Sequence, residues 1–174
     1  MRLFRGAPVP RMQLAAVLGV VTIVTLSTLP STPRASLTES ELVNNYSFSK
    51  GERCFIKKIN GLRHRKGKRR LDPDKQLGYV ARRHARGMAK NGSIYHDGDL
   101  GSTVTRWRRL GQNVGRGGGC KSVFRAFKNS SAHRANILGT WKHVGVGFDR
   151  RGGSIFVMHI FQSKRNPGNV YKYP

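Results

Sequence analysis

Acidic residues are scarce in this sequence. Its 174 residues include 33 Lys and Arg but only 8 Asp and Glu, so the formal net charge is +25. Hydrolysis by paired carboxylates needs two acids across a cleft, and the chain offers Asp97 and Asp99 close together and little else. This scarcity argues against glycosidase-type chemistry, and the positive charge predicts affinity for polyanions.

Several architectures lack the sequence features that they require. The chain has no glycine period, no sustained heptad, no internal repeat and only one long apolar run. Collagen-like, coiled-coil and multi-span membrane proteins are therefore excluded. Its length fits one domain, and its 37% hydrophobic residues supply a modest core.

The single apolar run lies near the N-terminus. A basic flank to Arg11 is followed by an uncharged stretch from Met12 to Leu29 and then by small and Pro-rich residues. This order is typical of a secretory signal. As a helix the stretch is about 27 Å long, close to the ~30 Å hydrocarbon thickness of a bilayer. Residues 1–35 are therefore predicted to be a signal peptide or an N-terminal membrane anchor, and either one predicts export.

Cysteine is limited to Cys54 and Cys120, 66 positions apart. Export favours a disulfide between them, which would stabilise the fold by about 4 kcal/mol in the chain-entropy model. Two buried free thiols are the alternative. Two cysteines alone do not make a structural zinc site.

The middle of the chain has mainly helical patterns. Residues 36–49 are polar with little periodicity and are predicted to be a linker. A helix is predicted over 51–63, where apolar residues recur at helical spacing. A second helix is predicted to begin with Asp72 as N-cap and Pro73 at its first position, and to end at Asn91–Gly92. A third is predicted from about Lys121 to Asn129, after a loop-rich region in which "GQNVGRGGG" supplies turns.

The C-terminal part changes to a strand-like period. The segments "HVGVGFD" and "SIFVMHIFQ" predict two strands, and "DRRGG" between them predicts a hairpin turn. Helices followed by a hairpin predict an α+β domain with helices packed on an antiparallel sheet.

Several motifs occur in one order that resembles a known family. They are "CFIKKINGLR" (54–63), "ARRHARGMA" (81–89), "YH" (95–96), "GQNVG" (111–115), "AFKNSSAHRANIL" (126–138) and "HVGVGF" (143–148). The order is similar to that in bacterial, particularly actinobacterial, members of the CAP superfamily, which includes SCP-like extracellular domains, cysteine-rich secretory proteins, antigen 5 and pathogenesis-related proteins. The resemblance implies a three-layer α-β-α sandwich with a central antiparallel sheet, over residues 50–165, followed by a tail at 166–174. It also implies an extracellular location.

The resemblance also implies a shallow cleft. Family members often hold a divalent metal there with two His and two Glu, and the matching positions here are His96, His133, Gln112 and Ser130. Because both carboxylates are replaced by neutral side chains, we expect no cofactor beyond weak zinc binding by His96 and His133. A neutral hydrogen-bonded cluster of the four side chains is the alternative.

Two other histidines are not predicted to belong to the cleft. His84 lies on an apolar helix stripe and is predicted to be a hydrogen-bonded core residue. His159 lies on the last predicted strand and receives no role.

A run of basic residues predicts a polyanion-binding surface, unless it is simply a solvated face. Its members are Arg63, Arg65, Lys66, Lys68, Arg69 and Arg70. For an exported bacterial protein the expected partners are cell-wall polymers, anionic lipids or other polyanions, with a sterol or lipid as a further ligand of the cleft.

The predicted function is therefore non-enzymatic binding of lipid or cell-envelope components by a monomer, secreted or anchored to the outer face of the cytoplasmic membrane. Two alternatives remain open. One is a hydrolase that uses His96 and His133 as acid and base, and the other is a polyanion-binding module without specificity for nucleic acid sequence.

Overall fold

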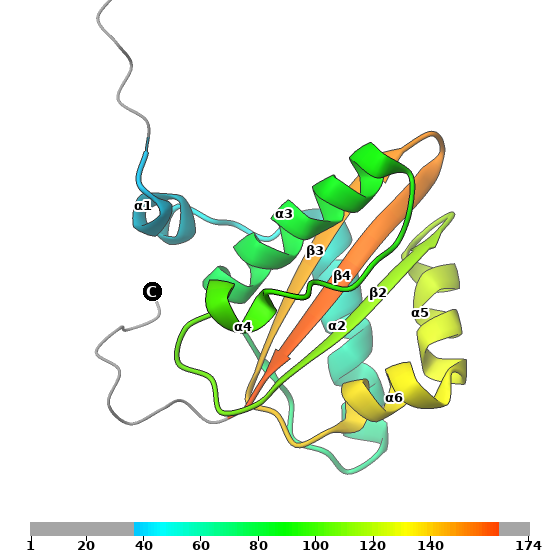
Figure 1. Cartoon of the computed structure of the whole chain (residues 1–174). Coiled ribbons are helices and arrows are strands. Elements are labelled where there is room, and N and C mark those ends of the chain that lie inside the picture. Colours follow the sequence, from blue (N-terminus) through cyan, green and yellow to red (C-terminus); the bar gives the residue numbers. More distant parts are fainter. Residues whose placement is uncertain (1–36, 164–174) are drawn as a thin grey trace, which may run out of the picture. The chain divides into compact units, whose positions relative to one another are not determined.

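The computed structural model describes residues 37–163, so the predicted signal or anchor and the C-terminal tail lie outside it. None of the helices in this range is long and apolar enough to cross a membrane. The elements, shown in Figure 1, are α1 (Glu39–Asn44), α2 (Lys50–Arg65), β1 (Asp72–Pro73), α3 (Lys75–Asn91), α4 (Leu100–Thr103), β2 (Leu110–Gly117), α5 (Cys120–Asn129), α6 (Ser131–Leu138), β3 (His143–Arg151) and β4 (Ser154–Gln162).

The sheet has the strand order β1-β3-β4-β2. The three long strands are antiparallel, as predicted, while the two-residue β1 pairs parallel to β3 and makes the sheet mixed. Gly152 and Gly153 join β3 to β4 with φ of 54° and 73°, which two-residue hairpin turns of the primed type require. The predicted hairpin is confirmed.

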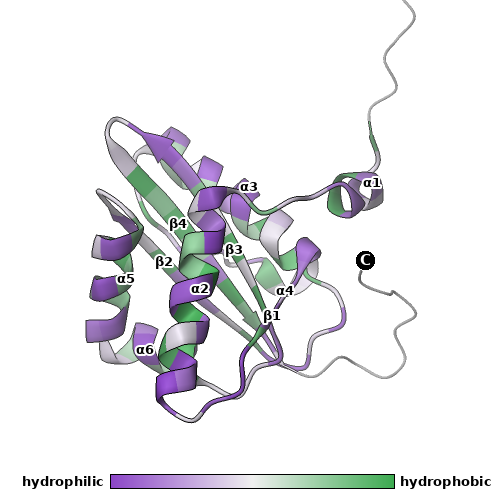
Figure 2. Cartoon of the chain, turned by 180° about the vertical axis from the view of Figure 1, so that it is seen from behind, coloured by the Kyte–Doolittle hydropathy of each residue, from purple (hydrophilic) through white to green (hydrophobic). Residues whose placement is uncertain are grey.

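Helices cover both faces of the sheet, which confirms the three-layer α+β sandwich (Figures 1 and 2). α2, α5 and α6 share one hydrophobic cluster with the sheet, and α3 and α4 share the other. The central strand β4 is buried on both sides because its residues alternate between these clusters. Ile155, Val157 and Phe161 belong to the first, and Phe156, Met158 and Ile160 to the second.

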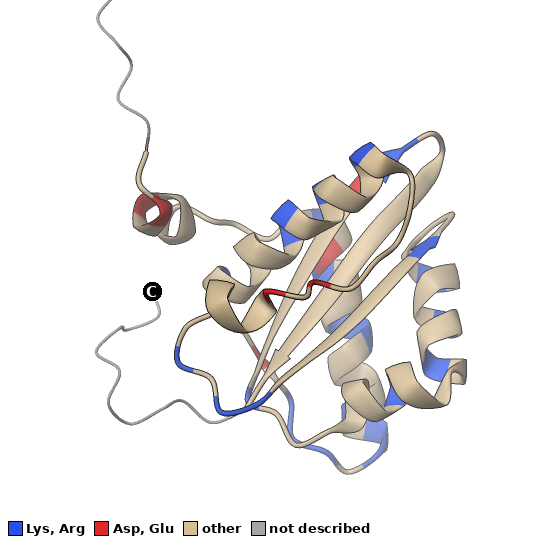
Figure 3. Ribbon diagram, viewed as in Figure 1, with Lys and Arg blue, Asp and Glu red and all other residues tan. Residues whose placement is uncertain are grey.

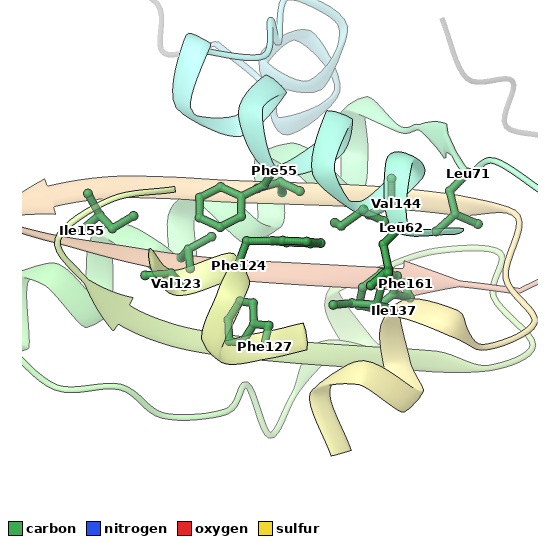
Figure 4. Packing of buried hydrophobic residues seen from close by; sticks show 13 residues of the cluster. Phe55, Leu62, Leu71, Val123, Phe124, Phe127, Ile137, Val144, Ile155 and Phe161 are labelled. Carbon is green, nitrogen blue, oxygen red and sulfur yellow. The ribbon is translucent and has the colours of Figure 1, made fainter. Parts of the chain in front are cut away.

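The first cluster ties α2 to α5. Phe55 of α2 and Phe127 of α5 are buried in it, together with Phe161 of β4 (Figure 4). The Cys54–Cys120 disulfide, with Cα atoms 6.5 Å apart, links the same two helices and confirms the predicted bridge.

α3 lies against β3 at two glycines. A Cβ on Gly145 would be 2.2 Å from the carbonyl carbon of Leu77, and one on Gly147 would be 2.0 Å from the carbonyl group of Ala81. No side chain fits at these distances, so the motif "HVGVGF" places glycine on the strand face that the backbone of α3 touches. Val144 and Val146, which alternate with these glycines, are buried in the other cluster.

The predicted start of α3 is wrong by two residues. Asp72 and Pro73 form β1, and the N-cap is Asp74, whose side chain accepts a hydrogen bond from the Leu77 amide at 3.0 Å. The amides of Asp72 and Asp74 donate to Lys142 and Val144. Proline between them has no amide to donate, so the Asp-Pro-Asp sequence satisfies both functions, edge strand and helix cap.

The segment "GQNVGRG" is a strand rather than a series of turns. Its glycines admit neighbouring rings, because a Cβ on Gly111 would be 3.0 Å from Trp141 and one on Gly115 would be 2.7 Å from Phe127. Glycine is usually depleted in strands, which explains why local propensity fails here. A second difference lies in the predicted linker at 36–49, which contains α1 and buries Val43 and Tyr46.

The close contact between β3 and α3 predicts the effect of one methyl group. Gly147→Ala should lower the free energy of unfolding by about 3 kcal/mol or more, because α3 must move away from the sheet. Gly118→Ala is the matched control, since nothing lies within 4 Å of its Cβ position. Urea unfolding of both variants is the measurement. Equal stability of the two would contradict this account of the packing.

Candidate functional site

His96 and His133 come from distant segments and are brought near each other. His96 is exposed in the loop after α3, and His133 is half-buried on α6. Burial lowers the pKa of His133 below its usual value, and the His96 imidazole lowers it further. This effect of His96 on His133 places the two rings in the same neighbourhood. Both features favour the neutral form of His133 at pH 7.

Gln112 of β2 holds the loop that carries His96. Its Oε1 accepts from the Asp97 amide at 3.0 Å, and its Nε2 donates to the Asp97 carbonyl at 3.0 Å. A glutamate at this position would keep the first bond but would place a carboxylate against the carbonyl oxygen. The glutamine therefore serves as a clamp for the peptide group next to His96, with both ends of its amide engaged.

A second amide network positions His133. Asn113, fully buried on β2, donates to the His133 carbonyl at 3.1 Å and accepts from Asn136 of α6 at 2.9 Å. Asn136 also donates to the Gln112 carbonyl at 3.0 Å. The Ser130 hydroxyl caps α6 through the His133 amide at 3.5 Å. The side chains of Gln112 and Ser130 thus bond to main-chain groups rather than to each other or to the two imidazoles, and the "HRANIL" motif binds α6 to β2.

His84 supports the same loop from α3. Its Nε2 lies 2.8 Å from the Tyr95 carbonyl oxygen, so this nitrogen carries the proton, and its Nδ1 lies 3.9 Å from a carboxylate oxygen of Asp97. A cavity of about 260 Å³ beside these residues is also lined by Arg83. His84 is hydrogen-bonded, as predicted for a core histidine, and in addition it positions the loop before His96.

His159 was given no role from the sequence, yet it lies beneath the site. Its side chain is fully buried on β4, with ring centroids 5.2 Å from Phe55 and 5.0 Å from Phe127. Neither ring nitrogen has a hydrogen-bond partner within residues 37–163. Burial, followed by the charge of His133, lowers its pKa to about 3. A histidine in an otherwise apolar strand is the available signal in the sequence, but the strand pattern does not reveal the aromatic rings around it.

A divalent metal does not fit these residues. No cluster of three or more His, Cys, Asp or Glu able to hold a metal ion occurs between residues 37 and 163. Gln112 uses both side-chain atoms on Asp97, and the Ser130 hydroxyl caps a helix. The imidazoles of His96 and His133 thus lack the anionic ligands that offset a dication.

The predicted basic run divides into two parts. Arg63 is buried, at 2% exposed, and donates to the carbonyls of Arg69, Ile137 and Gly139. It therefore joins α2 to the end of α6 and is withdrawn from the surface. The others, Arg65, Lys66, Lys68, Arg69 and Arg70, are exposed.

The protein combines a helix–sheet–helix sandwich with two neighbouring histidines. The sequence matches the model of the cysteine-rich secretory protein family, CAP, over residues 56–161. The chain belongs to this family, as the motifs predicted. A comparison with curated proteins returned no match.

Solved structures show the same fold. An outer surface protein of Borrelia burgdorferi is 17% identical, with a TM-score of 0.60, over 65% of this chain and 92% of that one. An extracellular SCP-domain protein of Bacillus anthracis is 23% identical, with a TM-score of 0.60 over 75% of this chain. A cysteine-rich secretory protein of Staphylococcus aureus is 19% identical, with a TM-score of 0.54 over 74%. The matches span only 45% and 49% of the latter two chains.

The buried imidazole predicts loss of stability in acid. The pKa of His159 is about 3 in the folded state and about 6.5 when unfolded, so the unfolded state binds more protons between these values. The neutral His159 contributes fully to the free energy of unfolding above pH 6.5, and this contribution decreases as the pH falls toward 3. We expect a loss of roughly 3 kcal/mol between pH 7 and pH 4.5. His159→Leu should flatten this dependence in urea titrations, whereas the exposed His64→Gln should not. A His159→Leu curve as steep as that of the native protein would contradict the assignment.

The donor set predicts weak zinc binding. The native protein should bind zinc chloride more weakly than micromolar, and Gln112→Glu should tighten binding roughly tenfold by adding a carboxylate near two imidazoles. Gln76→Glu on α3 adds the same charge where the side chain already only accepts hydrogen bonds. Calorimetric titration of the three proteins measures this. Micromolar zinc binding by the native protein is the result that this reading does not allow.

Proposed function

We propose that the protein is an exported, non-enzymatic CAP-domain binder that attaches to anionic components of the bacterial cell envelope. The observation that carries this proposal is that its few acidic side chains are used in internal ion pairs and helix caps. Glu52 is fully buried and bonded to Arg82 and Tyr46, and Asp74 caps α3. Most of the lysines and arginines between residues 37 and 163 therefore have no acid beside them.

The ion pairs of the described residues confirm this imbalance of charge. Besides Arg82 with Glu52, they include Arg69 with Asp72 at 4.0 Å, Arg83 with Glu39 at 3.7 Å, and His84 with Asp97 at 3.9 Å. Two of these four are exposed and so contribute little. Unpaired positive charges distributed over a surface create a field that attracts polyanions and weakens with salt.

Several features support binding rather than hydrolysis. Asp97, the acid nearest His96 in sequence, directs a carboxylate oxygen toward His84. His133 is held by its main chain and favours the neutral form. A neutral imidazole at His133, beside amide groups, suits hydrogen bonding to an uncharged hydroxyl or a lipid head group. No acid among residues 37–163 pairs with it, as a catalytic triad requires.

Export is supported by two kinds of evidence. The matched family is a secretory one, and one similar structure comes from an extracellular protein. The basic flank and apolar run of residues 1–35 are typical of a signal or an anchor. An oxidising location also suits the Cys54–Cys120 disulfide.

Salt elution from cell walls tests the proposed attachment. The purified protein should bind actinobacterial cell walls stripped of membrane with detergent at 50 mM NaCl, and at 500 mM NaCl at least nine-tenths should be released, because screening weakens charge attraction. Removing the membrane first eliminates retention by an uncleaved anchor. Retention that is unchanged at 500 mM, or no retention at 50 mM, would overturn the proposal.

A further inference from the structure

A furrow runs between α2 and α5, on the face of the sheet opposite to α3. It has a volume of about 690 Å³ and is lined by cations from both helices. These cations are Lys57, Lys58 and Arg65 of α2 and Lys121, Arg125 and Lys128 of α5. A second hollow of about 640 Å³ shares Arg65 and Lys128 with it. This hollow adds two further cations, Lys66 at the end of α2 and Arg134 of α6. We call the two together the α2–α5 furrow; Figure 3 shows the Lys and Arg positions of these helices.

No acid lines the furrow, and none of its six first-named cations forms an ion pair among residues 37–163. On α5 the cations recur at i, i+4 and i+7, so Lys121, Arg125 and Lys128 share one face. Like charges at this spacing destabilise an isolated helix. The row is therefore unfavourable for folding and favourable only toward an anion.

The floor of the furrow is apolar. It is formed by Phe124, the Cys54 end of the disulfide and Gly61, which has no side chain. Lys58 lies 5.9 Å from the centre of the Phe124 ring. The furrow thus has two cationic walls and a floor that suits carbon atoms.

We propose that the α2–α5 furrow binds a linear polymer of polyol phosphates, in which phosphodiesters alternate with short carbon chains. This inference rests on the proposed attachment to the envelope and names its ligand and its site. A phosphodiester has two non-bridging oxygens that share one negative charge and lie on opposite sides of the plane of the chain at the phosphorus, so each wall contacts one of them. A carboxylate presents both oxygens on one side and serves one wall. Arg65 and Arg125, one on each wall, supply the forked donors that phosphate oxygens accept.

Nucleic acid is the less suitable phosphodiester. Single strands are held by exposed aromatic side chains on which the bases stack. Phe124, the aromatic residue of the furrow, is only 7% exposed, and the exposed Trp107 lies outside its lining. The furrow offers charge without a stacking platform.

Two variants with equal charge changes test the site. Lys121→Gln/Arg125→Gln/Lys128→Gln removes one wall, and Arg86→Gln/Lys90→Gln/Arg150→Gln removes three exposed cations elsewhere. Binding of fluorescent poly(glycerol phosphate) is measured by anisotropy from 50 to 300 mM NaCl. We expect the wall variant to bind at least tenfold more weakly at 50 mM, with a salt slope smaller by about 2. The control variant should stay within threefold of the native protein. Thermal unfolding checks that each variant folds, and Lys57→Gln/Lys58→Gln/Arg65→Gln repeats the test on the other wall.

The outcomes separate this inference from the proposed function. The proposed furrow site would be overturned if the wall and control variants lost equal affinity. It would also be overturned if the native protein bound polygalacturonate or a single-stranded oligodeoxynucleotide as tightly as poly(glycerol phosphate). If native protein leaves cell walls in high salt while the wall variant is retained like the control, the furrow is wrong and the attachment stands. If the furrow binds the polymer as expected but the native protein does not bind cell walls, the furrow site is supported and the proposed attachment to the envelope is wrong.

Discussion

The direct contact between the backbone of α3 and the face of β3 is the constraint on which the rest of the structure depends. Gly145 and Gly147 leave no side chain between them and the carbonyl groups of Leu77 and Ala81. This contact fixes how deeply α3 sits and hence where its C-terminal end releases the loop that carries His96. Glycine weakens strands, but here the loss is offset by burial of the α3 apolar face, including Met88 and Ala85.

Polar contacts around the edge strand β2 are made by amide groups instead of charges. Gln112 holds the Asp97 peptide, and Asn113 and Asn136 hold the main chain of β2 and α6. The neutral side chains of Gln112 and Ser130 bind protein groups and leave little donor capacity for a ligand. Beneath them His159 is enclosed by aromatic rings and stays neutral because no partner compensates its charge.

Charge is separated in space by the same fold. The acids are mostly engaged in caps and pairs, such as Asp74 and Glu52, whereas cations from α2 and α5 collect along one furrow. The disulfide that joins these two helices also sets the width of the furrow, since Cys54 and Cys120 belong to them. The two helices therefore serve folding through their buried faces and the proposed binding through their exposed faces.

The sequence by itself determined the family, the layered α+β class, the disulfide and the final hairpin. These follow from local patterns: apolar periodicity, two adjacent glycines, a single pair of cysteines, and an ordered set of motifs. Only the tertiary structure decided that "GQNVGRG" is a strand, that Asp74 rather than Asp72 caps α3, that Arg63 is buried and that His159 lies in the core. Each depends on atoms far away in the chain. Glycine reads as a turn until Trp141 and Phe127 pack over it, and an arginine reads as surface until three distant carbonyls accept its hydrogens.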